Sequence, residues 1–398
     1  MLNSTFAGTI LSKCGILPGE LIMARPLAAS AILLLIPFMG CGGGGTGDGG
    51  GSTPPPPPAS WAAVDAAVNA AQGQFQGGLV LEVLTPAGVV HSVSAGGFSN
   101  SDAVLVASAS KWVSATVILR LVDRGSLSLD TTTGSLLKDG SGQPWAGNLG
   151  SAKLRHLLSF TTGISGDVPA SEDANLTLDQ AVKAIYADQG ATASVPGAYF
   201  FYGSTHLRIA ARMAEIATGK SWSQIVRDEL GAPLAWPLAA NFGGPNYNPA
   251  GGLYINGQEY VKFVSLQLRK GLYGSQRLLP EALIDQQRAD GFGPATTIAS
   301  SPYVDRLNKS YHYGFGNWLE TAGGGAPGAG DPVLRWSSTG TFGWAPWVVA
   351  DGAYAGVIMT RQPTQGSTVP SETLKGQLDP LIRQALASGT VTVVRTIP

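Results

Sequence analysis

The stretch Ser108-Ala109-Ser110-Lys111 opens a long apolar segment and is the most informative part of this chain. The residues that follow recur at the i, i+3, i+4 spacing of an amphipathic helix, and Gly125 ends it: Trp112, Ala115, Ile118, Leu119, Val122. On such a helix Ser108 and Lys111 share one face, with Cβ atoms about 5–6 Å apart. In a dry pocket the amine of Lys111 loses its preference for the charged form and can take the proton of the hydroxyl. The pair therefore predicts a serine nucleophile for acyl transfer that works without a histidine.

The same spacing also fits an ordinary helix N-terminus with a solvated lysine, so the motif needs support from elsewhere in the chain. Ser135 and Lys138 share this spacing, but they run into the turn-forming cluster 139–142, which favours a helix end or a loop. We therefore expect only Ser108 and Lys111 to be functional.

Composition bounds the function. The 398 residues are 44% hydrophobic and 13% charged, with a net charge of −1, which is typical of a globular core and gives no electrostatic footprint for nucleic acid. The four histidines have no metal-ligand spacing, and neither H-E-x-x-H nor G-x-S-x-G occurs, which argues against a zinc hydrolase and an α/β-hydrolase. We expect the histidines to be ordinary structural or surface residues, and we expect no cofactor.

The first 59 residues predict an export signal and a tether. Arg25 precedes an apolar run over 27–39, about as long as the core of a signal peptide, and Met23 is an alternative start to Met1. The residues before Cys41 resemble a bacterial lipobox, which implies lipidation of Cys41 and a membrane anchor. Gly42 after it favours the outer membrane, facing the periplasm or the cell surface; the alternative is an ordinary secreted protein. We assign 1–41 to the leader, the Gly/Pro-rich 42–59 to a linker and 60–390 to one domain without cysteine.

The order of elements in that domain predicts an α+β fold. Ser60 is expected to cap a first helix, and 79–84 and 89–95 read as a β-hairpin across the turn at 86–88. Helices are expected over 178–186, 204–218, 222–230 and 260–269, the first capped by Thr177 and the second by Ser204. Strands over 313–320, 344–349 and 354–359 and a helix from Ser371 follow. We therefore expect an antiparallel sheet flanked by N- and C-terminal helices, with an inserted, mainly helical subdomain.

Two further stretches are candidates for the site. The run 196–204 is extended and ends at a helix start, where the hydroxyl of Tyr202 can enter a cleft; a buried aromatic cluster is the alternative. In the segment 337–343, Gly340 and Gly343 allow a close approach of backbone or ligand, and exposed N–H groups there can hold an oxyanion. The alternative for that segment is a β-bulge or a tight turn.

Taken together, these parts resemble the class C-like branch of the serine β-lactamase and penicillin-binding-protein superfamily, which also contains esterases, D-amino-acid peptidases and nylon-oligomer hydrolases. Besides Ser108-x-x-Lys111, four stretches between about residues 78 and 359 are similar to motifs of that branch: 154–164 to R-H-L-L-T-H-T-S-G-L, 196–204 to P-G-x-x-F-x-Y-x-N, 248–253 to A-G-G-L, and 313–316 to Y-G-x-G.

The resemblance implies a role for each matched residue. Ser108 would be the acylated nucleophile, Lys111 its base and Tyr202 the phenol that passes the proton to the leaving group. The backbone N–H groups of Ser108 and Thr341 would form the oxyanion hole, with Ser204, Ser338 and Gly340 as further substrate-binding residues. Ser204 replaces the usual asparagine, as in nylon-oligomer hydrolases, and Ser338 replaces the lysine of K-T-G, which removes a partner for the carboxylate of penicillins.

We therefore expect a serine hydrolase that acts on small esters or amides, with esters favoured. A β-lactamase or D,D-peptidase type of penicillin-recognising enzyme is the alternative. A tethered binding protein that has lost turnover is the second alternative.

Overall fold

A seven-stranded antiparallel sheet is the centre of the structure, a computed structural model that describes residues 60–362 and 364–398. The predicted leader, linker and lipidated Cys41 lie outside the described residues. The strands follow the order β10 (His312–Tyr313), β11 (Trp318–Thr321), β12 (Val333–Ser337), β13 (Ala345–Val349), β14 (Ala355–Thr360), β1 (Leu79–Thr85) and β2 (Gly88–Ala95). Strand β1 therefore lies between its hairpin partner β2 and the last strand, β14, with Leu79 opposite Thr360.

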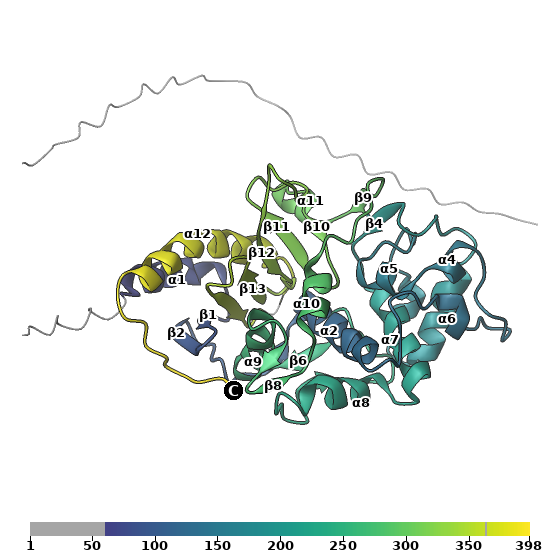
Figure 1. Ribbon diagram of the computed structural model, residues 1–398, viewed down its shortest axis with the longest axis horizontal. Coiled ribbons are helices and arrows are strands. Elements are labelled where there is room, and N and C mark those ends of the chain that lie inside the picture. Colours follow the sequence, from purple (N-terminus) through teal and green to yellow (C-terminus); the bar gives the residue numbers. More distant parts are fainter. Residues whose placement is uncertain (1–59, 363) are drawn as a thin grey trace, which may run out of the picture. The chain divides into compact units, whose positions relative to one another are not determined.

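Helices α1 (Ala62–Ala71) and α12 (Thr368–Ala387) contact each other and cover one face of this sheet (Figure 1). Alternate residues of β1 explain this layer, because a strand turns successive side chains to opposite faces. Leu79, Leu81 and Val83 belong to the core formed with α1 and α12, whereas Val80 and Leu84 belong to the core on the other side. There α9 (Gly257–Leu268) packs against β1, β13 and β14.

Helix α2 (Ser110–Asp123) is the central helix of the molecule (Figure 1). All twelve residues from Ser110 to Leu121 are buried, which is the behaviour of a helix surrounded by protein on every side. Its polar side chains have partners inside the core: Ser114 Oγ donates to Pro249 O at 2.7 Å, and Thr116 Oγ1 donates to Trp112 O at 2.9 Å. Helix α2 is therefore a rigid base for the residues at its N-terminus.

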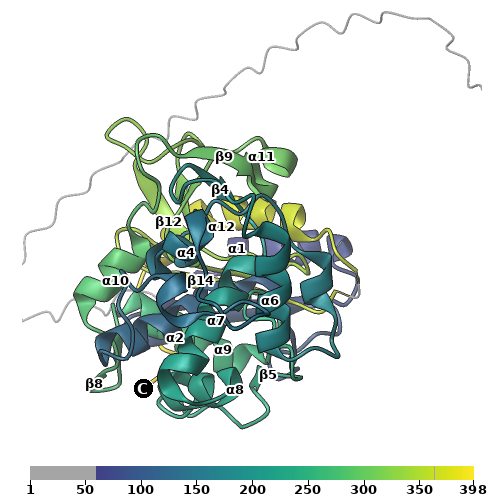
Figure 2. The same ribbon diagram turned by 90° about the vertical axis from the view of Figure 1, so that its right-hand side faces the viewer.

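The chain between β2 and β10 builds the mainly helical part, which Figure 2 shows from its own side. Its helices are α3 (Thr133–Leu136), α4 (Gly147–Ser151), α5 (Leu154–Leu158), α6 (Leu178–Gln189), α7 (Thr205–Thr218), α8 (Trp222–Val226), α10 (Glu281–Arg288) and α11 (Pro302–Leu307). This part also contains three small sheets. They are formed by β3 (Val104–Leu105), β6 (Leu253–Ile255) and β5 (Asn241–Phe242); by β4 (Tyr199–Phe201) and β9 (Thr297–Ser300); and by β7 (Leu272–Tyr273) and β8 (Gln276–Arg277).

The predicted fold class is confirmed: a sheet with terminal helices on one face and a helical part inserted between its strands. The Thr177 cap is confirmed as well, since its side chain accepts from Gln180 N. Several local predictions were wrong. Helix α1 begins after Trp61 without a side-chain cap, so Ser60 does not cap it. The single strand expected over 313–320 is two strands, because the chain turns at Gly316, where φ is +77°.

Among residues 60–362 and 364–398, no helix combines the length and the hydropathy that crossing a membrane requires.

Candidate active site

Ser108 lies in a tight helical turn, Ala107–Ala109, that leads directly into α2. Ala107 has a φ of +48°, a conformation that alanine rarely adopts and that a structure maintains only where its surroundings enforce it. The surroundings are close here. Val106 N donates to Leu253 O at 3.1 Å, and a Cβ on Gly340 would lie 2.4 Å from Val106 O. The absent side chain of Gly340 is thus what lets the β12–β13 connection lie against the turn that carries Ser108.

Lys111 is placed one helical turn after Ser108, as predicted. Its Nζ lies 2.9 Å from Ser108 Oγ and 3.0 Å from Ala250 O, and the residue is 3% exposed. Burial lowers the pKa of Lys111 from 10.5 to about 7, although the negative charges of Asp167 and Glu172 oppose this shift. Near neutral pH a large share of the amine is therefore uncharged, with a lone pair able to accept the Ser108 proton.

Tyr202 follows β4 and lies beside this pair, with its ring centroid 4.7 Å from Lys111 Nζ. Aromatic rings fix its orientation: Trp318 stacks on it at 5.0 Å and Tyr313 meets it edge-on at 5.9 Å. Burial raises the pKa of Tyr202 to about 12, while hydrogen bonding with the Ser108 side chain opposes the shift. The phenol therefore carries its proton at neutral pH and can give it to a leaving group.

The predicted substrate-binding segment, 337–343, reaches the same place from the sheet. Thr341 lines the pocket, and its backbone N–H donates to no other residue in the described part of the chain. Its carbonyl accepts from Gly366 N and Ser367 N, both at 3.1 Å, which holds the peptide in place. This N–H is free to bind an oxyanion, together with that of Ser108.

Three consecutive hydroxyls tie this segment down. Ser337 Oγ donates to Glu320, Ser338 Oγ donates to Ser108 O at 2.9 Å, and Thr339 Oγ1 donates to Glu372. Ser338 is 1% exposed, so its side chain joins the two halves of the site and does not line the pocket. The sequence suggested Ser338 and Gly340 as substrate-binding residues. In the structure neither lines the pocket, and both bring the segment close to Ser108.

The hydrogen bond from Thr339 to Glu372 in α12 belongs to a cluster of buried charged residues. Glu372 accepts from Lys375 Nζ at 2.8 Å, and Lys375 also pairs with Glu320. Arg335 contributes a further ion pair to Glu320 at 3.0 Å. Burial raises the pKa of Glu372, whereas the cations Lys375 and Arg335 lower that of Glu320 against its own burial. Such groups are expensive to bury, so their presence favours a role in fixing the position of Thr339.

Ser108, Lys111, Tyr202, Ser204 and Thr341 line one pocket of about 420 Å³. Gly203 and Thr339, which also line the pocket, belong to the predicted segments 196–204 and 337–343. Sequence reasoning missed its other residues, which come from segments outside the predicted motifs: Asp167, Pro302, Tyr303, Arg306, Trp318, Gln365 and Thr368. Trp318 and Tyr303 could have been suspected only from their aromatic character, since nothing in their spacing relates them to Ser108.

Asp167 also corrects the predicted role of Ser204. The Ser204 side chain makes no capping bond at the start of α7. Asp167 Oδ1 accepts instead from Ser204 N at 2.7 Å, Thr205 N at 3.0 Å and Thr205 Oγ1 at 2.8 Å. A Cβ on Gly203 would lie 2.6 Å from the same carboxylate, so this position needs glycine. The capping residue, Asp167, lies 37 residues before Ser204, so no local sequence pattern predicts this cap.

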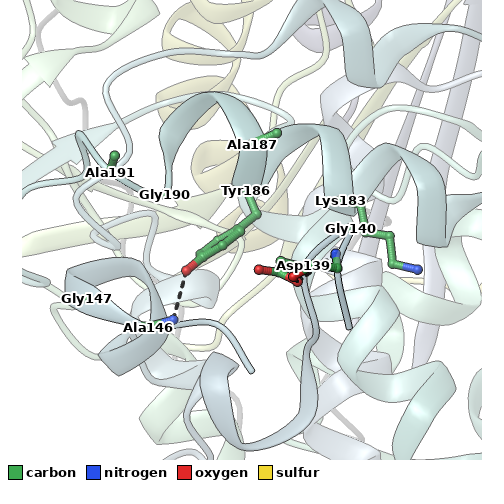
Figure 3. Close-up of a pocket in the computed structure, with 10 residues that line it drawn as sticks. Asp139, Gly140, Ala146, Gly147, Lys183, Tyr186, Ala187, Gly190 and Ala191 are labelled. Carbon is green, nitrogen blue, oxygen red and sulfur yellow. Dashed lines mark hydrogen bonds between the residues drawn. The ribbon is translucent and has the colours of Figure 1, made fainter. Parts of the chain in front are cut away.

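A second pocket, of about 540 Å³, lies in the helical part and has no pair of residues like Ser108 and Lys111 (Figure 3). It is lined by Tyr186, Lys183 and Asp139 among small residues, and Ala146 N donates to Tyr186 Oη at 2.9 Å. No nucleophile there stands beside a desolvated base, so the smaller pocket is the candidate active site.

The histidines have partners within the protein. His206 is buried between Thr162 Oγ1 at 3.0 Å and Phe201 O at 2.9 Å, and burial lowers its pKa to about 4. His91 and His312 each pair with an aspartate at 2.7 Å. Within residues 60–362 and 364–398, no three histidine, cysteine or acidic side chains are grouped as a metal site.

Comparisons with known proteins bear on the family and the fold. The Beta-lactamase family model matches residues 64–375. The crystal structure of a provisionally named β-lactamase from Bacteroides dorei has a TM-score of 0.67 and 27% identity, over 80% of this chain and 98% of that one.

Two curated proteins match shorter segments. Penicillin-binding protein 4 of Amycolatopsis lactamdurans is 32% identical over 148 residues, 37% of this chain and 38% of that protein. Monacolin J acid methylbutanoyltransferase of Aspergillus terreus is 33% identical over 155 residues, 32% of this chain and 35% of that protein. The matches thus span little more than a third of the length of these relatives.

Proposed function

The chain belongs to the Beta-lactamase family of serine hydrolases, and on that premise we propose that it cleaves small carboxylic esters or amides, esters preferentially, through an acyl-enzyme on Ser108. The observation that carries the proposal is the 2.9 Å contact between Ser108 Oγ and the buried amine of Lys111, whose pKa is lowered to about 7. A hydroxyl beside an uncharged amine in a water-poor site is an activated nucleophile.

In the proposed reaction, neutral Lys111 takes the Ser108 proton as Oγ forms a bond to the carbonyl carbon. The oxygen of that carbonyl becomes an oxyanion, which the N–H groups of Ser108 and Thr341 stabilise. The carbonyl re-forms as the bond to the leaving alkoxide or amine breaks, and Tyr202 gives its proton to the leaving group while Lys111 returns a proton to Tyr202. Water then attacks the acyl-enzyme with the same groups in reverse, releasing the acid and free Ser108.

Esters are favoured over penicillins because Ser338 stands where K-T-G has lysine. Its hydroxyl is committed to Ser108 O, and it is buried. The position therefore offers no cation to a penicillin carboxylate.

Fluorophosphonate labelling of the full chain tests the nucleophile. Wild type is expected to be labelled and Ser108→Ala is not, whereas Ser135→Ala, which removes the serine of the other Ser-x-x-Lys match, should label like wild type. Absence of labelling in wild type would favour the binding-protein alternative. Hydrolysis of p-nitrophenyl butyrate compared with a chromogenic cephalosporin then ranks esterase against lactamase, and faster cephalosporin turnover would reverse our order.

Acyl transfer to an alcohol is a second candidate, supported by the 33% identity to an acyltransferase over 155 residues. The same acyl-enzyme would pass its acyl group to a hydroxyl in place of water. Adding n-butanol to the p-nitrophenyl butyrate reaction tests this: butyl butyrate, detected by gas chromatography, supports transfer, and unchanged butyrate yield contradicts it.

A further inference from the structure

Arg306 is a positively charged residue of the candidate active site that has no role in the proposed reaction. Arg306, in α11, lines the pocket together with Ser108. It is exposed, and its guanidinium has neither a hydrogen-bond nor an ion-pair partner among residues 60–362 and 364–398. An unpaired guanidinium beside a nucleophile is available to a ligand, since its planar N–H groups match an anionic group with two oxygens.

The backbone that carries Arg306 is firmly placed. Ser301 Oγ caps α11 by accepting from Tyr303 N, and Tyr303 is 1% exposed. The Tyr303 ring packs on Trp318 at 4.6 Å, and Trp318 in turn stacks on Tyr202. Tyr303 and Arg306 are one helical turn apart, and both line the pocket. A continuous row of aromatic rings therefore links the helix that carries Arg306 to Tyr202.

The other charged groups of the pocket leave Arg306 without a competitor for an anion. Lys111 must be neutral to act as base. Asp167 already accepts three hydrogen bonds at the start of α7. The pocket is also lined by Thr368, the first residue of the twenty-residue helix α12, whose N-terminus has no side-chain cap. An uncapped helix start adds a partial positive charge at that wall.

We propose that Arg306 forms an anion subsite in this pocket, and that the substrate is an ester or amide that bears a carboxylate a few bonds from the cleaved bond. This rests on the proposed function and names its substrate class. A carboxylate is favoured over a phosphate because one guanidinium balances one charge, and the second charge of a phosphate would lie near Asp167 without a cation.

Paired substrates test the subsite in the full-length protein. Mono-p-nitrophenyl adipate is compared with its neutral methyl ester, which places the carboxylate on the acyl side. The pair 4-acetoxybenzoic acid and methyl 4-acetoxybenzoate places it on the leaving side. Wild type should favour the anion of one pair by roughly 5- to 30-fold in kcat/KM, as expected for a charge-assisted hydrogen bond. The preference should shrink in 0.5 M NaCl, because salt screens exposed charges.

Variants separate the subsite from the catalytic groups. Arg306→Gln should bring the anionic-to-neutral ratio of kcat/KM close to one, and Arg306→Lys should keep most of the preference. Arg227→Gln is the matched control, because Arg227 is also exposed but lies at the end of α8 outside the pocket. A ratio that Arg306→Gln leaves unchanged, or no preference in wild type on either pair, overturns the proposal.

Binding without turnover keeps the two proposals distinguishable. By calorimetry, Ser108→Ala should bind adipate more tightly than adipamide, and the difference should vanish in Ser108→Ala/Arg306→Gln. If that difference holds while wild type hydrolyses no ester, the subsite stands and the proposed function fails. If hydrolysis proceeds while adipate and adipamide bind alike, the function stands and the subsite fails.

Discussion

The protonation state of Lys111 sets the pH range in which Ser108 is reactive. Because burial lowers the pKa of Lys111 to about 7, the base is lost as the pH falls through 7. We expect kcat/KM to decline about tenfold per pH unit below that point. The raised pKa of Tyr202, about 12, keeps the phenol protonated, so no alkaline decline is expected up to about pH 10. A pH–rate profile from 5 to 10 measures both limbs, and a flat acid limb would remove Lys111 as base.

Burying this amine should also destabilise the fold. Between pH 7 and 10.5 the unfolded chain binds the Lys111 proton and the folded chain largely does not, so the penalty is full below pH 7 and disappears above about 10.5. Lys111→Met should therefore raise the melting temperature at pH 6 while abolishing activity. Lys138→Met, at the exposed second match, should change neither. A lower melting temperature for Lys111→Met by calorimetry would contradict this reading.

The hydroxyl of Tyr202 should matter to rate more than to binding, because its proton moves only in the transition state. Tyr202→Phe keeps the ring between Trp318 and Tyr313, so the aromatic packing remains. We expect kcat to fall by roughly 10²–10⁴ with little change in KM. The exposed Tyr254, changed to phenylalanine, is the control. Steady-state kinetics decide, and an unchanged kcat would exclude the phenol from the reaction.

At the scale of elements, helix α7 depends on a distant carboxylate. Asp167→Ala removes three hydrogen bonds at its first residues and should reduce the free energy of unfolding by about 1–2 kcal/mol, as for other lost caps. Ser204→Ala removes no bond and should leave stability unchanged. Because the charge of Asp167 raises the pKa of Lys111, Asp167→Ala should also move the acid limb of the rate profile to lower pH. Urea unfolding and the pH profile measure the two effects, and equal stabilities of the two variants would refute the cap.

Sequence patterns predicted elements well where the cause is local. The hairpin of β1 and β2, the Thr177 cap and the i, i+3 pairing of Ser108 with Lys111 all depend on residues a few positions apart. Asp167, Arg306 and the Glu372 tie to Thr339 were missed, because packing of separate segments brings these residues to the site. The break at Gly316 was missed for a related reason: the aromatic pattern of a strand continues on both sides of the turn.

At the scale of the whole molecule, the predicted tether and anchor can be tested apart from the enzyme. We propose that Cys41 is lipidated and that residues 42–59 only connect it to the domain that begins near Ser60. Cys41→Ala should move the protein from the membrane fraction to the soluble fraction with esterase activity unchanged, and a chain that begins at Ser60 should be equally active. Fractionation and p-nitrophenyl butyrate assays measure this. Loss of activity from the shorter chain would place the domain boundary elsewhere.

The position of β1 between β2 and β14 has a consequence for biogenesis. Strand β1 is synthesised well before β14, with which it pairs, and Glu82 pairs with Arg395, which lies 313 residues later. Until the last segments leave the ribosome, neither the sheet nor its cover of α1 and α12 can be completed, and such long-range closure is slow. We propose that this delay keeps the nascent chain unfolded for the export that residues 1–41 predict, so that the active site forms only after export.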